Sequence, residues 1–215
     1  MHPVISRAIA QQAANHLSAT DQALRPVIAR HGLCTIAPHV DYYPELVRSI
    51  IGQQLSVKAA ASIANRFTGL FDNQFPSPGQ ILSVSPESLR EVGFSRAKAL
   101  YVQDLARHVL DGRLSFDALD QQSNEHIIEN LTAVKGIGEW TAHMFLVFAM
   151  GRTDVLPIGD LGVRTAAMKL YSLPALPSAS ELKAVAQEHQ WHPYESIASW
   201  YLWQSLDNAP KVPTD

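Results

Sequence analysis

The sequence predicts an all-α protein, and two observations support this expectation. Apolar residues recur at helical spacing, as with Val47, Ile51 and Leu55 in the segment 44–67. Serine or aspartate stands just before most of the apolar segments, as is typical of helix N-caps. Strand-like alternation is weak along the whole chain. We therefore expect about ten helices and no sheet.

Capping residues and glycines delimit the individual helices. The predicted starts are Ser56, Ser85-Pro86, Ser95, Ser123, Asp160, Ser180 and Pro193, and the predicted stops are Gly93, Gly112 and Gly151. The segments 71–80 and 172–180, rich in proline, serine and other turn residues, are expected to be loops.

Composition narrows the class of protein. Charged residues make up 17% of the 215, which argues against a disordered chain or a coiled coil. The single cysteine, Cys34, excludes an intramolecular disulfide, a four-cysteine zinc site and a cysteine-ligated iron–sulfur cluster. No apolar run approaches the roughly 20 residues of a membrane span, and the N-terminus has no signal-peptide pattern. We expect a cytoplasmic protein without membrane contact.

The net charge of −3 counts against nucleic-acid binding without excluding it. Backbone N–H groups and a few well-placed cations can hold phosphates in a chain that is not basic overall.

The most informative segment is residues 131–150, in which Gly136-Ile137-Gly138 separates two apolar helical stretches. Two glycines around one apolar residue allow a sharp turn and a close approach to a ligand. Amide groups at the start of the second helix are suited to an anion such as a DNA phosphate. A plain turn between two helices is the alternative interpretation.

Downstream, Asp160 stands before the helical segment 161–171. A fixed carboxylate can stabilise the positive charge that develops on a sugar when an N-glycosidic bond breaks. It can also orient or deprotonate an attacking water molecule. The alternative is that Asp160 serves only as a helix N-cap.

Together these segments resemble the helix-hairpin-helix superfamily of base-excision DNA glycosylases, and within it the alkylpurine branch. The hairpin match covers Val134, Lys135, Gly136, Ile137, Gly138, Thr141 and Ala142, and the carboxylate match covers Pro157, Asp160 and Val163. Gly159 departs from the pattern, because many alkylpurine members have a second aspartate there. The matching segments span residues 44–204.

The resemblance implies roles for individual residues. Asp160 would be the catalytic carboxylate. Trp140 stands where some members have a Schiff-base lysine, which implies an enzyme without lyase activity. Trp140, Trp191 and Tyr194 would line the base pocket, with a core position beneath the hairpin as the alternative for Trp140. Trp200 and Trp203 are interpreted as core residues.

The same resemblance implies DNA and cation contacts. Segment 50–56 would reach into the duplex, with Gln54 filling the gap left by a flipped nucleotide, Leu55 as the second choice and Ser56 beside them. A glutamine-rich surface turn is the alternative. Lys135, Gly136 and Gly138 would hold phosphate. Main-chain carbonyls of Thr132, Val134 and Ile137 would bind structural sodium or potassium, and no cofactor would be required.

Residues 45–150 would then form a central subdomain that ends in the hairpin, and residues 1–44 with 151–215 a terminal subdomain, with the hairpin beside a DNA cleft between them. The expected function is a monomeric, monofunctional glycosylase that excises 3-methyladenine and 7-methylguanine from damaged double-stranded DNA. Two alternatives remain: the same fold acting on hypoxanthine, an ethenopurine or uracil, and a DNA-binding module without catalysis.

Overall fold

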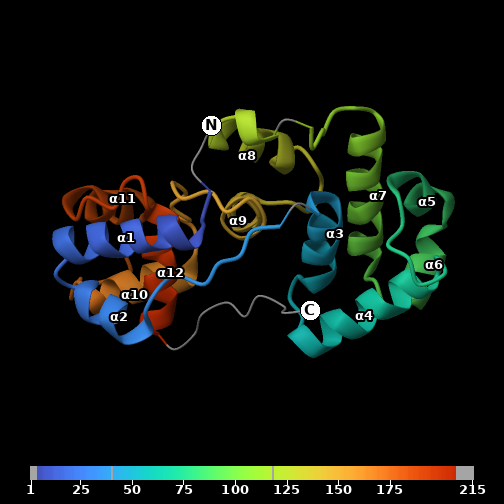
Figure 1. The fold of residues 1–215 in the computed structure, drawn as a ribbon. Helices are drawn as coiled ribbons and strands as arrows, with labels where there is room; N and C mark the ends of the chain where they lie inside the picture. The colour runs from blue at the N-terminus through green and yellow to red at the C-terminus, as the bar shows by residue number, and fades with distance from the viewer. Residues whose placement is uncertain (1–3, 40, 118, 207–215) are drawn as a thin grey trace. The chain divides into compact units, whose positions relative to one another are not determined.

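The computed structural model describes residues 4–39, 41–117 and 119–206, and it is helical (Figure 1). The α-helices are α1 (Arg7–Thr20), α2 (Arg25–His31), α3 (Tyr42–Gly52), α4 (Val57–Gly69), α5 (Pro78–Ser83), α6 (Pro86–Glu91), α7 (Arg96–Leu110), α8 (Asn124–Thr132), α9 (Glu139–Met144), α10 (Leu161–Leu170), α11 (Ala179–Glu188) and α12 (Glu195–Ser205). A 3₁₀ turn, Leu119–Gln121, precedes α8, and a π-helical turn, Phe145–Ala149, continues α9.

The predicted all-α class is confirmed for the described residues. The extended pairing found among them is an isolated bridge between Val4 and Arg152. Within the same ranges, none of the helices combines the length and apolar character that a membrane span requires.

The chain divides into two compact units. Unit 1 is formed from the described residues of Met1–Val40 and His143–Asp215, and unit 2 from those of Asp41–Ala142. The sequence placed the second boundary at residue 150, whereas the division falls inside the continuous helical stretch that begins with α9.

Helix α12 lies at the centre of unit 1, where it packs against α10, α2 and α1. Its residues from Ser196 to Trp203 are all buried, because a helix surrounded by others has no solvent-facing side. The helix therefore lacks the one-sided apolar pattern of a surface helix, and its side chains can contact several neighbouring elements.

Helix α7 organises unit 2 by packing against α3, α5 and α6, and α3 in turn packs against α4. The α7 side chains Ala99, Val102, Leu105 and Ala106 are buried at helical spacing. The long helix α7 thus forms the central support against which the shorter helices α3, α5 and α6 pack.

Capping residues set most helix starts as the sequence predicts. The side chains of Ser56, Ser85, Ser95, Ser123 and Asp160 each accept a hydrogen bond from an amide of the first turn. Three expectations were wrong. Helix α5 begins inside the predicted loop 71–80, α11 is capped by Ser178 rather than Ser180, and α12 begins at Glu195 rather than Pro193.

The first and second errors have one cause. Ser77 with Gln80, and Ser178 with Glu181, form capping boxes in which each side chain bonds the other residue's backbone. In both segments neighbouring prolines or serines obscured that signal.

Candidate functional site

Asp160 stands at the N-cap of α10 in unit 1, and two N–H groups hold one of its carboxylate oxygens. Its Oδ1 accepts a hydrogen bond from the Val163 amide at 2.7 Å and another from Trp203 Nε1 at 2.9 Å. The side chain is buried, with 8% of the residue surface exposed. The carboxylate is therefore fixed in orientation from both its own helix and α12.

Trp203 is held in turn by an aromatic contact. Its ring stacks on Phe148, with the centroids 5.6 Å apart and the planes 23° apart. The expectation that Trp200 and Trp203 are core residues is confirmed by their burial. The bond from Trp203 to Asp160 was missed, because two residues 43 positions apart leave no spacing pattern.

The glycines on either side of Asp160 differ in their surroundings. A Cβ built at Gly162 would lie 3.1 Å from Asp160 Oδ1 and 3.1 Å from Trp203 Cδ1, so this glycine leaves room for their hydrogen bond. A Cβ at Gly159 would meet no atom within 4 Å. The position at which many alkylpurine members have a second aspartate is thus open and exposed.

The hairpin in unit 2 runs from the end of α8 to the start of α9. Val134 and Ile137 are buried and anchor it. Gly136 adopts a φ of +85°, and a Cβ there would lie 2.2 Å from the Tyr101 ring. At Gly138 a Cβ would meet nothing within 4 Å. Gly136 is therefore required by the fold, whereas Gly138 tolerates a side chain sterically.

The amides of the hairpin fall into two groups. The Lys135 amide donates to Asp104 Oδ2 at 2.9 Å, so it is used within the fold. For the amides of Gly136 and Gly138, the described part of the chain contains no hydrogen-bond acceptor. These two amides are available to an anion, as is the exposed side chain of Lys135.

The predicted cation ligands are main-chain oxygens of the same hairpin. The Val134 carbonyl accepts the Ile137 amide at 3.1 Å, which leaves this oxygen a second lone pair. No cluster of His, Cys, Asp or Glu suited to a metal ion occurs within the described ranges. That the carbonyls of Thr132, Val134 and Ile137 bind a monovalent ion therefore stays a prediction.

Between α3 and α4 the chain makes an exposed turn that carries Gln54 and Leu55, the two candidates for filling the gap left by a flipped nucleotide, and we call these two residues the wedge. Gln54 has a φ of +58° and is exposed, and Leu55 keeps 40% of its surface exposed. Ser56 accepts the Ala59 amide at 3.3 Å as the N-cap of α4, so its oxygen already has a structural role. The apolar side chain of Leu55 and the amide side chain of Gln54 thus lie next to each other on a tight, exposed turn.

Lys98 from α7 holds this turn in place. Its Nζ donates to the carbonyls of Ile51 at 2.8 Å and Gln53 at 2.6 Å, which satisfies the carboxyl end of α3. Burial lowers the pKa of Lys98. The Gln53 side chain then donates from Nε2 to the Gly136 carbonyl at 2.8 Å.

The three predicted pocket residues lie in different environments. Trp140 is 50% exposed, which contradicts the alternative of a core position beneath the hairpin. Trp191 has no exposed surface, and its Nε1 donates to Asp21 at 2.8 Å, so its indole serves the core of unit 1 instead of offering a face to a base. Tyr194 is half-buried and makes an edge contact with His16.

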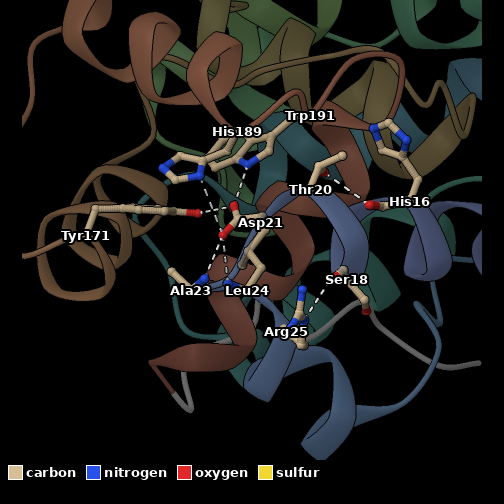
Figure 2. Close-up of polar contacts among 10 residues, drawn as sticks. All are labelled: His16, Ser18, Thr20, Asp21, Ala23, Leu24, Arg25, Tyr171, His189 and Trp191. Carbon is tan, nitrogen blue, oxygen red and sulfur yellow. Dashed lines mark hydrogen bonds and ion pairs between the residues drawn. The ribbon is translucent and has the colours of Figure 1, made fainter.

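Figure 2 shows the cluster around Asp21, which the sequence did not reveal. This carboxylate is fully buried and accepts four hydrogen bonds: from the amides of Ala23 and Leu24, from the Tyr171 hydroxyl at 2.6 Å and from Trp191 Nε1. Burial and the bond to Asp21 raise the pKa of Tyr171. Asp21 therefore joins the end of α1 to the end of α10 and to the segment before α12.

Comparison with known proteins places these features in a family. Residues 47–190 match the model of the HhH-GPD superfamily of base excision DNA repair proteins. The alkylbase DNA glycosidase-like protein mag2 of Schizosaccharomyces pombe is 34% identical over 199 residues, covering 90% of this chain and 92% of that protein. DNA-3-methyladenine glycosylase 1 of the same organism is 37% identical over 76% of this chain and 72% of its own.

Solved structures give the same result. A DNA-3-methyladenine glycosidase from Bacillus halodurans superposes with a TM-score of 0.81 at 37% identity, covering 90% of this chain and 88% of that one. The Schizosaccharomyces pombe 3-methyladenine DNA glycosylase Mag1, in complex with abasic DNA, gives 0.79 at 33% identity over 94% and 100%. The chain belongs to the HhH-GPD superfamily of base excision DNA repair proteins.

Proposed function

We propose that this protein is a monofunctional DNA glycosylase that excises alkylated purines from damaged double-stranded DNA, with Asp160 as its catalytic carboxylate. The observation that carries the proposal is the fixed Asp160 carboxylate, held through Oδ1 by the Val163 amide and the Trp203 indole. A helix cap alone needs only the first of these bonds. The relatives named as 3-methyladenine glycosylases support the substrate class.

At the sugar, the negative charge of Asp160 stabilises the oxocarbenium-like state in which the glycosidic bond is broken. The same carboxylate orients or deprotonates the water molecule that completes hydrolysis. A purine alkylated at N3 or N7 already carries positive charge and departs without being protonated first. One carboxylate is therefore sufficient for this substrate class.

Two segments of unit 2 bind the DNA. The amides of Gly136 and Gly138, with the Lys135 side chain, bind a DNA phosphate. The turn between α3 and α4 fills the gap left by the flipped nucleotide with Gln54 or Leu55, which lowers the cost of unstacking. Trp140 offers an exposed indole face to an electron-poor base.

The enzyme makes no Schiff base, because Trp140 occupies the position of the lysine that lyase members use.

No cofactor takes part in the reaction. The lone Cys34 is buried, and burial raises the pKa of its thiol to about 12, which disfavours the thiolate that a metal cluster needs. The main-chain carbonyls of Thr132, Val134 and Ile137 would hold sodium or potassium, which would stiffen the hairpin. The protein acts as a monomer in the cytoplasm.

A base-release assay tests this proposal. Purified protein is incubated with duplexes that each contain one 3-methyladenine, 7-methylguanine, hypoxanthine, ethenoadenine or uracil. We expect release of the two cationic purines and an abasic strand that breaks only after alkali. Release of hypoxanthine, ethenoadenine or uracil alone favours the neutral-lesion enzyme. Binding without any release indicates a silent DNA-binding module, and a borohydride-trapped adduct contradicts the monofunctional assignment.

A further inference from the structure

Helix α7 presents three side chains that contact the two segments assigned above to DNA binding. Lys98, Tyr101 and Asp104 are spaced three residues apart, which places them along one side of the helix. We call these three residues the positioning face of α7. All of their contacts described below lie within unit 2.

The first end of this face holds the turn between α3 and α4. Lys98 donates from one ammonium group to two carbonyls, those of Ile51 and Gln53. The second carbonyl belongs to the residue directly before Gln54, whose positive φ sets the direction of the wedge. The position of the wedge therefore depends on a bond made from α7.

The other end of the face holds the hairpin. The Tyr101 ring occupies the space beside Gly136 that any side chain there would need. One turn further along, Asp104 accepts the Lys135 amide. The two residues fix the hairpin immediately before the free amides of Gly136 and Gly138.

Gln53 connects the two segments directly. Its carbonyl accepts the Lys98 ammonium, and its side chain donates to the Gly136 carbonyl at 2.8 Å. A movement of the hairpin would therefore be transmitted through this hydrogen bond to Gln53, the residue directly before the wedge. Without this bond each segment would keep its own support from α7 but lose its link to the other.

We propose that Gln53 and the positioning face of α7 couple the wedge turn to the hairpin, so that phosphate binding by the hairpin drives insertion of the turn into the duplex. These four residues are positioning residues for base flipping. The inference rests on the proposed function, because it takes the turn and the hairpin as the DNA-binding segments. It goes further by naming the side chains that make the two act together.

The coupling has a measurable consequence. Flipping a paired base has to overcome stacking and pairing, whereas a base that is already unpaired resists much less. A rigid link between hairpin and wedge matters for the first substrate and little for the second. A variant that loses the link should therefore be impaired mainly on a paired lesion, which a general loss of stability does not produce.

The decisive variant is Gln53→Met, which removes the donor and keeps the length of the side chain. Its matched control is Gln103→Met, because Gln103 also lies in unit 2 and donates from Nε2 to a carbonyl, that of Val84, at 2.9 Å. Both variants and the wild type are given duplexes with one 7-methylguanine, either paired with cytosine or inside an unpaired bubble. Single-turnover release, melting temperature and the fluorescence of a neighbouring 2-aminopurine are recorded.

We expect Gln53→Met to slow release from the paired duplex by about three- to tenfold, as the loss of one hydrogen bond implies. In the bubble it should slow release by no more than about twofold. Gln103→Met should leave both rates unchanged while lowering the melting temperature by a similar amount. Equal slowing on both duplexes, or equal behaviour of the two variants, overturns the coupling.

A second pair of variants gives an independent result. Asp104→Asn keeps an oxygen that can accept the Lys135 amide, whereas Asp104→Ala removes it. We expect the paired-lesion defect in Asp104→Ala and its rescue in Asp104→Asn, and identical defects in both would count against the inference. If wild-type protein unstacks 2-aminopurine without releasing a base, the proposed function fails alone, and the 2-aminopurine signal of Gln53→Met still decides the coupling.

Discussion

At the scale of single residues, Asp160 depends on a partner from another helix of unit 1. Trp203 donates to the same oxygen that the Val163 amide binds, and it is itself stacked on Phe148. The helix cap fixes one direction of the carboxylate and the indole fixes a second. A catalytic carboxylate that accepted only the capping hydrogen bond from the Val163 amide could still rotate about that hydrogen bond.

The variant Trp203→Phe tests this positioning role. It keeps an aromatic ring for the stack and removes the N–H donor. We expect the single-turnover rate to fall by at least about tenfold, since a hydrogen bond to a charged group contributes about 1.5–3 kcal/mol. The matched control is Trp200→Phe in the same helix, because among the described residues no hydrogen bond of the Trp200 indole is found. Equal losses of rate in the two variants would assign Trp203 to packing alone.

Trp140 supports a second prediction at this scale. Its half-exposed indole can stack on a cationic base, and a cation–π contact contributes roughly 0.5–2 kcal/mol. Trp140→Ala should therefore slow excision of 7-methylguanine by about two- to thirtyfold. Any excision of a neutral base should change less. A variant with unchanged excision of the cationic lesion would remove Trp140 from the base pocket.

Residue types and local patterns predicted Asp160, Gly136, Gly138 and the exposed Gln54, because each belongs to a short motif. The partners that hold them could not be predicted in the same way. Trp203 lies 43 positions from Asp160, and Trp191 lies 170 positions from Asp21. Trp191 was assigned to the pocket because it belongs to the terminal aromatic segment, and only the buried Asp21 carboxylate reveals that its indole nitrogen is needed in the core.

At the scale of elements, the hairpin combines a glycine that the fold requires with one that it does not. Gly136 has a positive φ and Tyr101 against it, whereas Gly138 faces open space. The sequence motif presents the two glycines as equivalent. The structure separates their roles and shows which of them can be substituted to test DNA binding without disturbing the fold.

The variant Gly138→Asp places a carboxylate where a phosphate should approach. We expect affinity for damaged and undamaged duplexes to fall alike by at least about tenfold, as binding to phosphate carries no sequence information. The melting temperature should stay close to that of the wild type. Gly79→Asp is the control, because it makes the same charge change in unit 2 at another open, exposed glycine. If both variants bind DNA like the wild type, the hairpin does not bind phosphate.

The start of a helix could be predicted from the sequence where a single capping serine precedes an apolar segment. Single serines before apolar runs predicted the starts of α4, α6, α7 and α8. Helix α5 begins in a segment that was predicted to be a loop because of its prolines and other turn residues, although Ser77 and Gln80 form its capping box. The centre of α12 could not be predicted either, since a helix buried on all sides has no amphipathic pattern.

At the scale of the whole molecule, the net charge of −3 is compatible with DNA binding because the proposed contacts are few and local. Backbone amides of the hairpin and one lysine replace a broad basic face. The acidic remainder of the chain lowers non-specific attraction to DNA. In the proposed function, affinity and selectivity therefore come from these few contacts and from the chemistry at Asp160.

The most direct test of the central claim compares wild-type protein with Asp160→Asn in single-turnover release of 7-methylguanine at saturating enzyme. The asparagine oxygen can still accept the bonds from Val163 and Trp203, so the fold and the DNA affinity should persist. Loss of the charge that stabilises the oxocarbenium-like state should lower the rate by at least about a hundredfold. A folded, DNA-binding Asp160→Asn protein that releases the base at nearly the wild-type rate would contradict the claim that Asp160 is the catalytic carboxylate.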